Sequence, residues 1–264
     1  MNTKMEAGTA FQQAGDGPVI VLIHGLGLNM DVWQWQLNAL LQHYTVLRYD
    51  LLGHGASIKP KGAYSMPQMV EQLRQLMDAQ GHRQFVVIGF SLGGLIAKAF
   101  TLAHPDRVSA LVVMNSAYAR TDEQRAGIML RVEQSRADGP GTTVSDALVR
   151  WFSSGFIENN PGIIEKVRQW VLANDKQVYP ELYLMLANAD IGLDEAISTI
   201  TCPTLIFTGE EDYGNSAEMA RKMCAKIPGS KLAILQGLRH MALVEDPPTV
   251  NRILIDFLSA ALEK

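Results

Sequence analysis

A serine flanked by glycines is the strongest chemical signal in the chain. Residues 89–93 read Gly-Phe-Ser-Leu-Gly, with Ser91 at the centre, between an apolar run and a helical pattern. A sharp strand-to-helix turn of this kind presents a serine hydroxyl as a nucleophile, and side chains in place of the glycines would collide with neighbouring backbone. The N–H groups at the following helix start favour developing negative charge. The pattern predicts acyl transfer through Ser91, against the alternative of a tight glycine turn without chemistry.

A serine hydroxyl needs a base, and the chain offers six histidines for that role. His240 follows the last expected strand and precedes the last helix, at the strand end where α/β sheets place active sites. His43, His82 and His104 lie near helix ends and are interpreted as solvated or capping side chains. His24 is interpreted as a structural residue that shapes its loop. His240 is therefore the predicted base.

A carboxylate should orient the base, and the run 204–208 leads into Gly-Glu-Glu-Asp at residues 209–212. Asp212 is preferred to the two glutamates, because the acid is expected several residues beyond its strand. The other place for such an acid, after the run 110–114, begins with Asn115 and so lacks a carboxylate. The triad is thus predicted in the chain order serine, aspartate, histidine.

An acyl-transfer site also requires two backbone N–H groups aimed at the carbonyl oxygen of the substrate. One is expected from Leu92, the residue after the nucleophile. The other is expected from the loop His-Gly-Leu-Gly at residues 24–27, where Leu26 is the predicted donor.

Short apolar runs alternate with amphipathic helical patterns and must position these residues. Such runs suit strands buried on both faces of a parallel sheet that helices cover, which predicts an α/β fold with a mostly parallel, doubly wound sheet. Ser65, with Gln68 three residues later, marks one helix start, and residues 250–261 carry an unbroken apolar stripe. The expected strands are Val19–Ile23, Tyr44–Tyr49, Phe85–Gly89, Ala110–Met114, Thr204–Thr208 and Leu232–Leu235.

One stretch breaks the alternation. Residues 121–199 show only helical patterns and no convincing strand. An all-helical segment inserted in an α/β sheet is most simply a lid, or cap, over one edge. We therefore expect a core made of residues 1–120 and 200–264, with the helical lid inserted between them.

Composition narrows the class of protein. The chain has 264 residues, 47% of them apolar, and a formal net charge of −4 with scattered basic residues, which disfavours a nucleic-acid partner. No apolar run reaches the roughly 18 residues of a membrane span, and residues 1–15 lack a signal-peptide core. Cys202 and Cys224 show no metal-ligand spacing and are expected to be buried free thiols, which indicates a cytoplasmic protein without a metal. Oligomeric state cannot be read from the sequence.

Taken together, five motifs resemble the α/β-hydrolase superfamily, over nearly the whole chain from about Val19 to Leu258. By position the resemblance makes Ser91, Asp212 and His240 the triad and implies a small-molecule ester or lactone substrate, with no organic cofactor. The motifs are His-Gly-Leu-Gly at 24–27, Asp-Leu-Leu-Gly-His-Gly-Ala-Ser at 50–57, Gly-Phe-Ser-Leu-Gly-Gly at 89–94, Gly-Glu-Glu-Asp at 209–212 and His240 with Glu-Asp-Pro at 245–247.

The expected lid is most similar to that of 3-oxoadipate enol-lactonases, in residues 150–152, 167–168 and 187–190. That similarity implies ring opening of a small carboxylated enol-lactone through an acyl-serine, with Trp151 either in the pocket wall or in the lid core. The chain departs from the family at the His-Gly pair that begins the first loop and in the helix 179–186. Arg131, Arg150 and Arg168 are candidates to pair with a substrate carboxylate, or are solvated helix residues.

The same fold supports other activities. Haloalkane dehalogenases and epoxide hydrolases place an aspartate where this chain has Ser91, so they are set aside. C–C bond hydrolases of ring-cleavage pathways and cofactor-free perhydrolases keep the serine and remain alternatives. A ligand-binding receptor on this fold is the non-enzyme alternative, and the presence of all three triad residues favours an enzyme over it.

Overall fold

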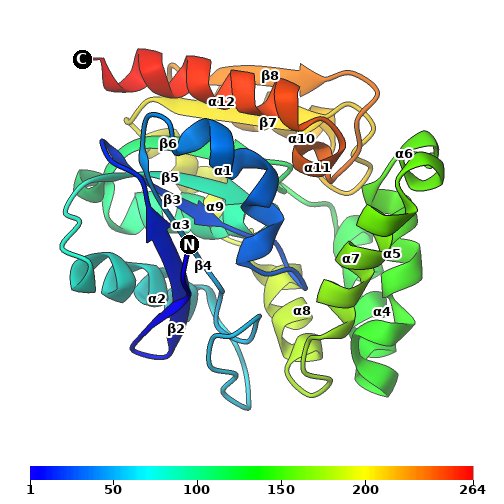
Figure 1. Ribbon diagram of the computed structural model, residues 1–264. Helices are drawn as coiled ribbons and strands as arrows, with labels where there is room; N and C mark the ends of the chain where they lie inside the picture. The colour runs from blue at the N-terminus through cyan, green and yellow to red at the C-terminus, as the bar shows by residue number, and fades with distance from the viewer. Residues whose placement is uncertain (264) are drawn as a thin grey trace.

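Eight strands form one sheet in the computed structural model, which describes residues 1–263. Their order is β1-β2-β4-β3-β5-β6-β7-β8, and every neighbouring pair from β4 to β8 is parallel (Figure 1). All six expected strands are present, with ends that differ by a residue or two, and the predicted α/β fold class is confirmed. The strands are β1 Lys4–Glu6, β2 Thr9–Ala14, β3 Val19–Ile23, β4 Thr45–Tyr49, β5 Phe85–Phe90, β6 Val108–Met114, β7 Thr204–Gly209 and β8 Lys231–Leu235.

The first two strands were not expected from the sequence. β1 and β2 form an antiparallel hairpin that joins the sheet through β4, turning at Ala7 and Gly8, whose φ angles are 44° and 82°. Residues 1–15 are polar, so their apolar content gave no strand signal. The hairpin forms because the β4 edge offers backbone partners, a tertiary effect that composition does not report.

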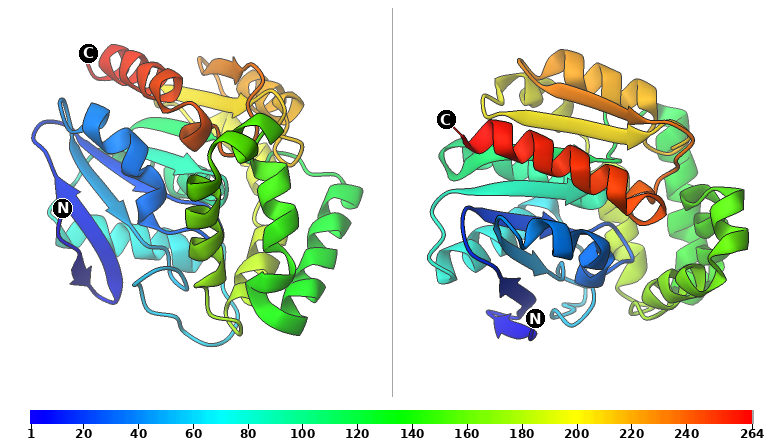
Figure 2. Two further views of the ribbon diagram at one scale, coloured as in Figure 1. Left: turned by 45° about the vertical axis from the view of Figure 1, so that its right-hand side comes forward. Right: turned by 45° about the horizontal axis from the view of Figure 1, so that its top comes forward.

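Helices cover both faces of the sheet and separate its core into two halves. Alternate strand residues point to opposite faces, so β3 sends Val21 to one half and Ile20 and Leu22 to the other. α2, α3 and α10 pack on the first face, and α1 and α12 on the second (Figure 2). These helices are α1 Gln34–Leu40, α2 Met66–Ala79, α3 Leu92–Ala103, α10 Ala217–Lys226 and α12 Pro247–Leu262, and short turns of helix are η1 Met30–Trp33, η2 Pro105–Arg107 and α11 Ala242–Glu245.

The helical segment between β6 and β7 lies beyond one end of the sheet (Figure 2). We call residues 121–199 the helical insert. Among the described residues it contains no strand, as the sequence pattern predicts. They are α4 Asp122–Asp138, η3 Gly139–Thr142, α5 Val144–Trp151, α6 Ser154–Asn159, α7 Pro161–Leu172, α8 Tyr179–Asn188, α9 Leu193–Ala196 and η4 Ile197–Thr199.

Two smaller expectations have clear outcomes. Ser65 begins α2 as expected, and its N–H donates to Gln68 Oε1 at 2.8 Å. Cys202 and Cys224 are free thiols, but both are only partly buried, where full burial was expected. Among residues 1–263 no helix combines the length and the apolar character needed to cross a bilayer.

Candidate active site

Ser91 occupies a strained turn between β5 and α3. Its φ and ψ are 57° and −115°, a combination that residues with a side chain rarely adopt. The chain turns sharply enough that a Cβ on Gly89 would lie 2.1 Å from the Gly93 carbonyl oxygen, and one on Gly93 would lie 2.2 Å from the Ile23 oxygen. The two flanking glycines are therefore required by close backbone approach, as the sequence pattern predicts.

The structure brings Ser91, His240 and Asp212 together from three separate loops. His240 Nε2 lies 3.1 Å from Ser91 Oγ, and His240 Nδ1 lies 2.7 Å from Asp212 Oδ2. Asp212 follows β7 and His240 follows β8, so both side chains reach the serine from the carboxyl ends of parallel strands. His240 and Asp212 are 7% and 2% exposed, and water therefore competes little for their hydrogen bonds. This geometry matches the nucleophile, base and orienting acid of an acyl-transfer site.

Asn115 is a site residue that the sequence reasoning mentioned only to exclude a carboxylate. Its side-chain amide donates to Asp212 Oδ2 at 3.0 Å, the same oxygen that contacts His240. The backbone N–H groups of Gly214 and Asn215 donate to Asp212 Oδ1 at 3.1 and 3.0 Å. Four donors therefore hold both oxygens of the carboxylate in one orientation.

The loop that carries Leu26 packs directly on the nucleophile. A Cβ on Gly25 would lie 3.1 Å from Ser91 Cβ, so this loop borders the serine. Leu26 lines the cavity described below, while Leu92 is fully buried at the start of α3. The two predicted oxyanion donors thus come from the two segments on either side of Ser91.

Two buried histidines fix that loop. His24 Nε2 accepts from the Leu51 N–H at 3.0 Å, and His54 Nε2 accepts from the Gly27 N–H at 3.1 Å. Burial lowers the pKa of His24 to about 4 and that of His54 to about 3, so both rings are neutral near pH 7. The expected structural role of His24 agrees with this geometry. The partner role of His54 was missed, because the ring acts on a residue 27 positions away.

A cavity of about 290 Å³ opens above Ser91 and is roofed by α4, α5 and α8 of the helical insert. Trp151 forms part of the wall, and its ring centroid lies 6.1 Å from that of His240. Most other wall residues are apolar, aromatic or cationic, among them Leu26, Leu28, Phe90, Ile128, Tyr179, Tyr183, Leu186, Arg120, Arg131 and Arg150. Gln124, Asp212 and Asn215 also line the cavity. The mixture of an apolar surface and a few charged groups is typical of a small-molecule site.

The three arginines of the wall differ in their partners. Arg120 is paired with Asp190 at 3.0 Å, and the Arg131 side chain donates to the Tyr183 hydroxyl at 3.1 Å. The Arg150 guanidinium makes no hydrogen bond or ion pair within the described part of the chain, and burial lowers its pKa. Arg168, the third arginine singled out from the sequence, does not line the cavity and pairs with Glu165 on the surface of α7.

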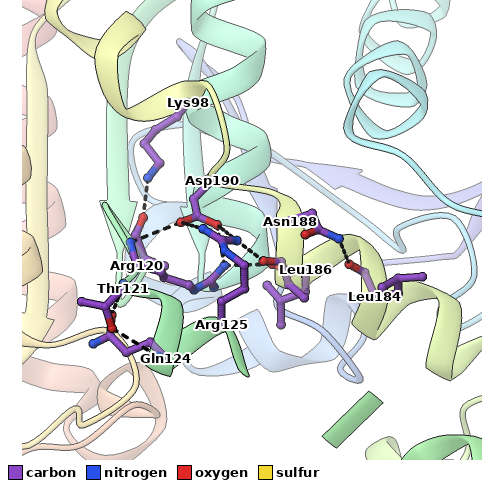
Figure 3. Close-up of polar contacts among 11 residues, drawn as sticks. Lys98, Arg120, Thr121, Gln124, Arg125, Leu184, Leu186, Asn188 and Asp190 are labelled. Carbon is purple, nitrogen blue, oxygen red and sulfur yellow. Dashed lines mark hydrogen bonds and ion pairs between the residues drawn. The ribbon is translucent and has the colours of Figure 1, made fainter. Parts of the chain in front are cut away.

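A buried charge cluster anchors the insert behind Arg120 (Figure 3). Asp190 is fully buried and binds both Arg120 and Arg125, at 3.0 and 3.1 Å. Lys98 of α3 is also fully buried and donates to the Ala117 carbonyl oxygen at 2.6 Å. Burial lowers the pKa of Lys98 to about 7. Arg120 is held by Asp190, which it shares with Arg125, whereas Arg131 and Arg150 form no ion pair among the described residues. Those two guanidinium groups are therefore the ones available to a cavity ligand.

Comparison with known proteins places these features in context. A profile of the α/β hydrolase fold matches residues 18–145. 3-Oxoadipate enol-lactonase 2 of Acinetobacter baylyi is 31% identical over 91% of the chain and 88% of its own length. The (E)-2-((N-methylformamido)methylene)succinate hydrolase of the same organism is 28% identical over 92% and 91%. The enol-lactonase of Burkholderia xenovorans superposes with a TM-score of 0.91 at 28% identity, over 98% of this chain and all of that one.

Proposed function

Since the chain belongs to the α/β-hydrolase superfamily and is a hydrolase, we propose that it opens a small carboxylated ester or lactone through an acyl-serine intermediate. The observation that carries the proposal is the unbroken contact from Asp212 through His240 to Ser91, in the wall of a cavity that also exposes unpaired arginines. 3-Oxoadipate enol-lactone, which gives the relative in Acinetobacter baylyi its name, is a substrate of this kind.

In the first half of the reaction, His240 Nε2 removes the proton from Ser91 Oγ as that oxygen attacks the carbonyl carbon. Asp212 holds Nδ1–H and stabilises the imidazolium that forms. The N–H groups of Leu26 and Leu92 donate to the tetrahedral oxyanion. The C–O bond to the leaving oxygen then breaks, and that oxygen takes the proton from Nε2.

In the second half, a water molecule gives a proton to His240 Nε2 and attacks the acyl carbon. The second tetrahedral intermediate collapses, Ser91 Oγ takes back the proton, and the carboxylic acid is released. In a lactone the leaving oxygen stays attached to the acyl group, so the product is one molecule with a new carboxylate. No residue outside the triad has to move a proton, and the two backbone N–H groups only donate hydrogen bonds.

Arg131 and Arg150 support a carboxylated substrate. Both face the cavity from the insert, and neither has an acidic partner there among the described residues. A guanidinium in a partly buried wall gains most from a bidentate carboxylate, because its planar fork matches that geometry. Trp151 supplies the apolar wall next to the reacting atoms. We propose that the helical insert, residues 121–199, is the lid of a core formed by residues 1–120 and 200–264.

The test is a hydrolysis panel at neutral pH with a carboxylated enol-lactone, short p-nitrophenyl esters and a ring-cleavage diketone, each with Ser91→Ala as the control. Fast lactone opening that Ser91→Ala lowers by several orders of magnitude is expected, as for other triads. Cleavage of the diketone alone would replace the proposal with a C–C bond hydrolase. Turnover that survives Ser91→Ala would refute the nucleophile.

A further inference from the structure

The residues on either side of His240 both bind one short segment of the helical insert. We call Val149–Ser153, where α5 ends and α6 begins, the α5–α6 junction. The Arg239 guanidinium donates to the carbonyl oxygens of Val149 and Phe152 at 2.9 and 3.1 Å. The Met241 N–H donates to the Trp151 carbonyl at 2.9 Å. Four consecutive residues of the insert are thus spanned by contacts from the loop of the proposed base.

Glu245, in α11 just after that loop, fastens the same junction from its other end. Its Oε2 accepts from the Ser153 hydroxyl at 2.6 Å and from the Ser153 N–H at 3.1 Å. Ser153 Oγ in turn accepts from the Phe156 N–H at 3.3 Å and so caps the start of α6. The acidic residue of the motif that follows His240 therefore serves as an anchor for the insert.

The electrostatics of a helix end explain the choice of arginine. The last carbonyl groups of an α-helix have no partner within the helix and carry partial negative charge. Arg239 supplies two hydrogen bonds and a positive charge at this place, and its side chain is only 21% exposed. Its guanidinium also lies 5.7 Å from the centre of the Tyr213 ring and 3.4 Å from Glu211, so it is held on several sides.

We propose that Arg239 is a positioning residue that determines specificity, because it fixes the end of α5 against the catalytic loop. Arg150 and Trp151 are the last two residues of α5, and both line the cavity. Their distance from the reacting serine therefore depends on the contacts of this loop, and Arg239 supplies the two at the end of α5. The inference rests on the proposed function only in taking a carboxylate as the ligand of Arg150.

Kinetics give the first test. In Arg239→Met an unbranched apolar side chain replaces the stem of the arginine and the donors are lost, so the end of α5 can shift. Charge-assisted hydrogen bonds correspond to roughly 10- to 100-fold in binding, so we expect kcat/KM for a carboxylated ester to fall by about 10-fold or more, mainly through KM. Cleavage of p-nitrophenyl acetate, which needs no arginine, should change by less than about threefold. Arg239→Lys should restore part of the loss, since one donor and the charge return.

Trp151 fluorescence gives the second test and needs no substrate. The emission of Trp151 is obtained as the difference between each protein and the same protein with Trp151→Phe. We expect Arg239→Met to shift this emission or its quenching, and Glu245→Gln to do so in the same direction. Arg252→Met, at an exposed position of α12, is the matched control and should change neither emission nor kinetics.

The outcomes separate the two proposals. If wild type shows no preference for a carboxylated substrate, the proposed function fails, and the Trp151 emission alone decides the role of Arg239. An unchanged emission in Arg239→Met and Glu245→Gln would overturn the inference. So would an equal loss of both activities in step with the melting temperature, because that is the result of general destabilisation. If Arg239→Met does not fold, the same two measurements on Glu245→Gln decide.

Discussion

Replacing Asn115 removes one donor from the proposed catalytic acid without touching the substrate cavity. Asn115 is fully buried after β6, does not line the cavity, and donates to Asp212 Oδ2 at 3.0 Å. That oxygen also contacts His240. Without the Asn115 amide, Oδ2 keeps only its contact with His240, so the carboxylate holds the imidazole less firmly in its orientation.

The magnitude follows from the number of donors. A hydrogen bond to a charged group contributes about 1.5–3 kcal/mol, and each 1.4 kcal/mol of barrier is about tenfold in rate. Asp212 keeps the N–H groups of Gly214 and Asn215, so the loss is partial. We expect kcat to fall by about 10- to 100-fold with KM unchanged, which is less than the loss expected from deleting Asp212 itself.

Two substitutions separate the lost donor from a backbone effect. The φ of Asn115 is 47°, a conformation that asparagine and glycine tolerate better than alanine. Asn115→Gly and Asn115→Ala both remove the amide, so both should lose the same factor in kcat, whereas Ala should be less stable than Gly by about 1 kcal/mol. Steady-state kinetics and denaturant unfolding measure the two quantities. A kcat within about twofold of wild type in Asn115→Gly would refute the reasoning, as would a loss that appears in KM.

Three further predictions concern the cavity, the nucleophile turn and the charge cluster. Arg150→Met should raise KM for a carboxylated substrate by about tenfold or more and leave the rate of p-nitrophenyl acetate cleavage unchanged, as measured by initial rates. Gly93→Ala should abolish the folded protein in circular dichroism, because its Cβ would lie 2.2 Å from a backbone oxygen, whereas Gly162→Ala, with open space around it, should fold normally. Burial lowers the pKa of Lys98 to about 7, so above that pH the unfolded chain binds more protons than the folded protein, and the free energy of unfolding rises with pH. This rise is at most about 1.4 kcal/mol per pH unit. Lys98→Met should flatten it in urea titrations between pH 7 and 9.

The sequence predicted most of what depends on local pattern. The turn at Ser91 was visible because close backbone approach demands glycine at fixed positions, and the six buried strands were visible because a parallel sheet makes them almost wholly apolar. The β1–β2 hairpin was invisible for the opposite reason, since most of its residues are polar and its partner β4 lies 32 to 38 residues away along the chain. The placement of Trp151 in the cavity wall rested on resemblance, and the alternative of plain lid packing was left open by the residues themselves.

The residues missed at the site share a physical cause. Asn115 acts on a carboxylate 97 positions away, and Arg239 acts on carbonyl groups 87 and 90 positions away. A backbone carbonyl is a partner that every residue carries, so the sequence of the α5–α6 junction holds no mark of being bound. What the sequence does hold is a cation directly before His240 and an acid five residues after it, in a loop whose histidine is already assigned. Charged residues that flank a proposed catalytic group and have no role in its chemistry are therefore the ones to examine first for contacts that position the substrate wall.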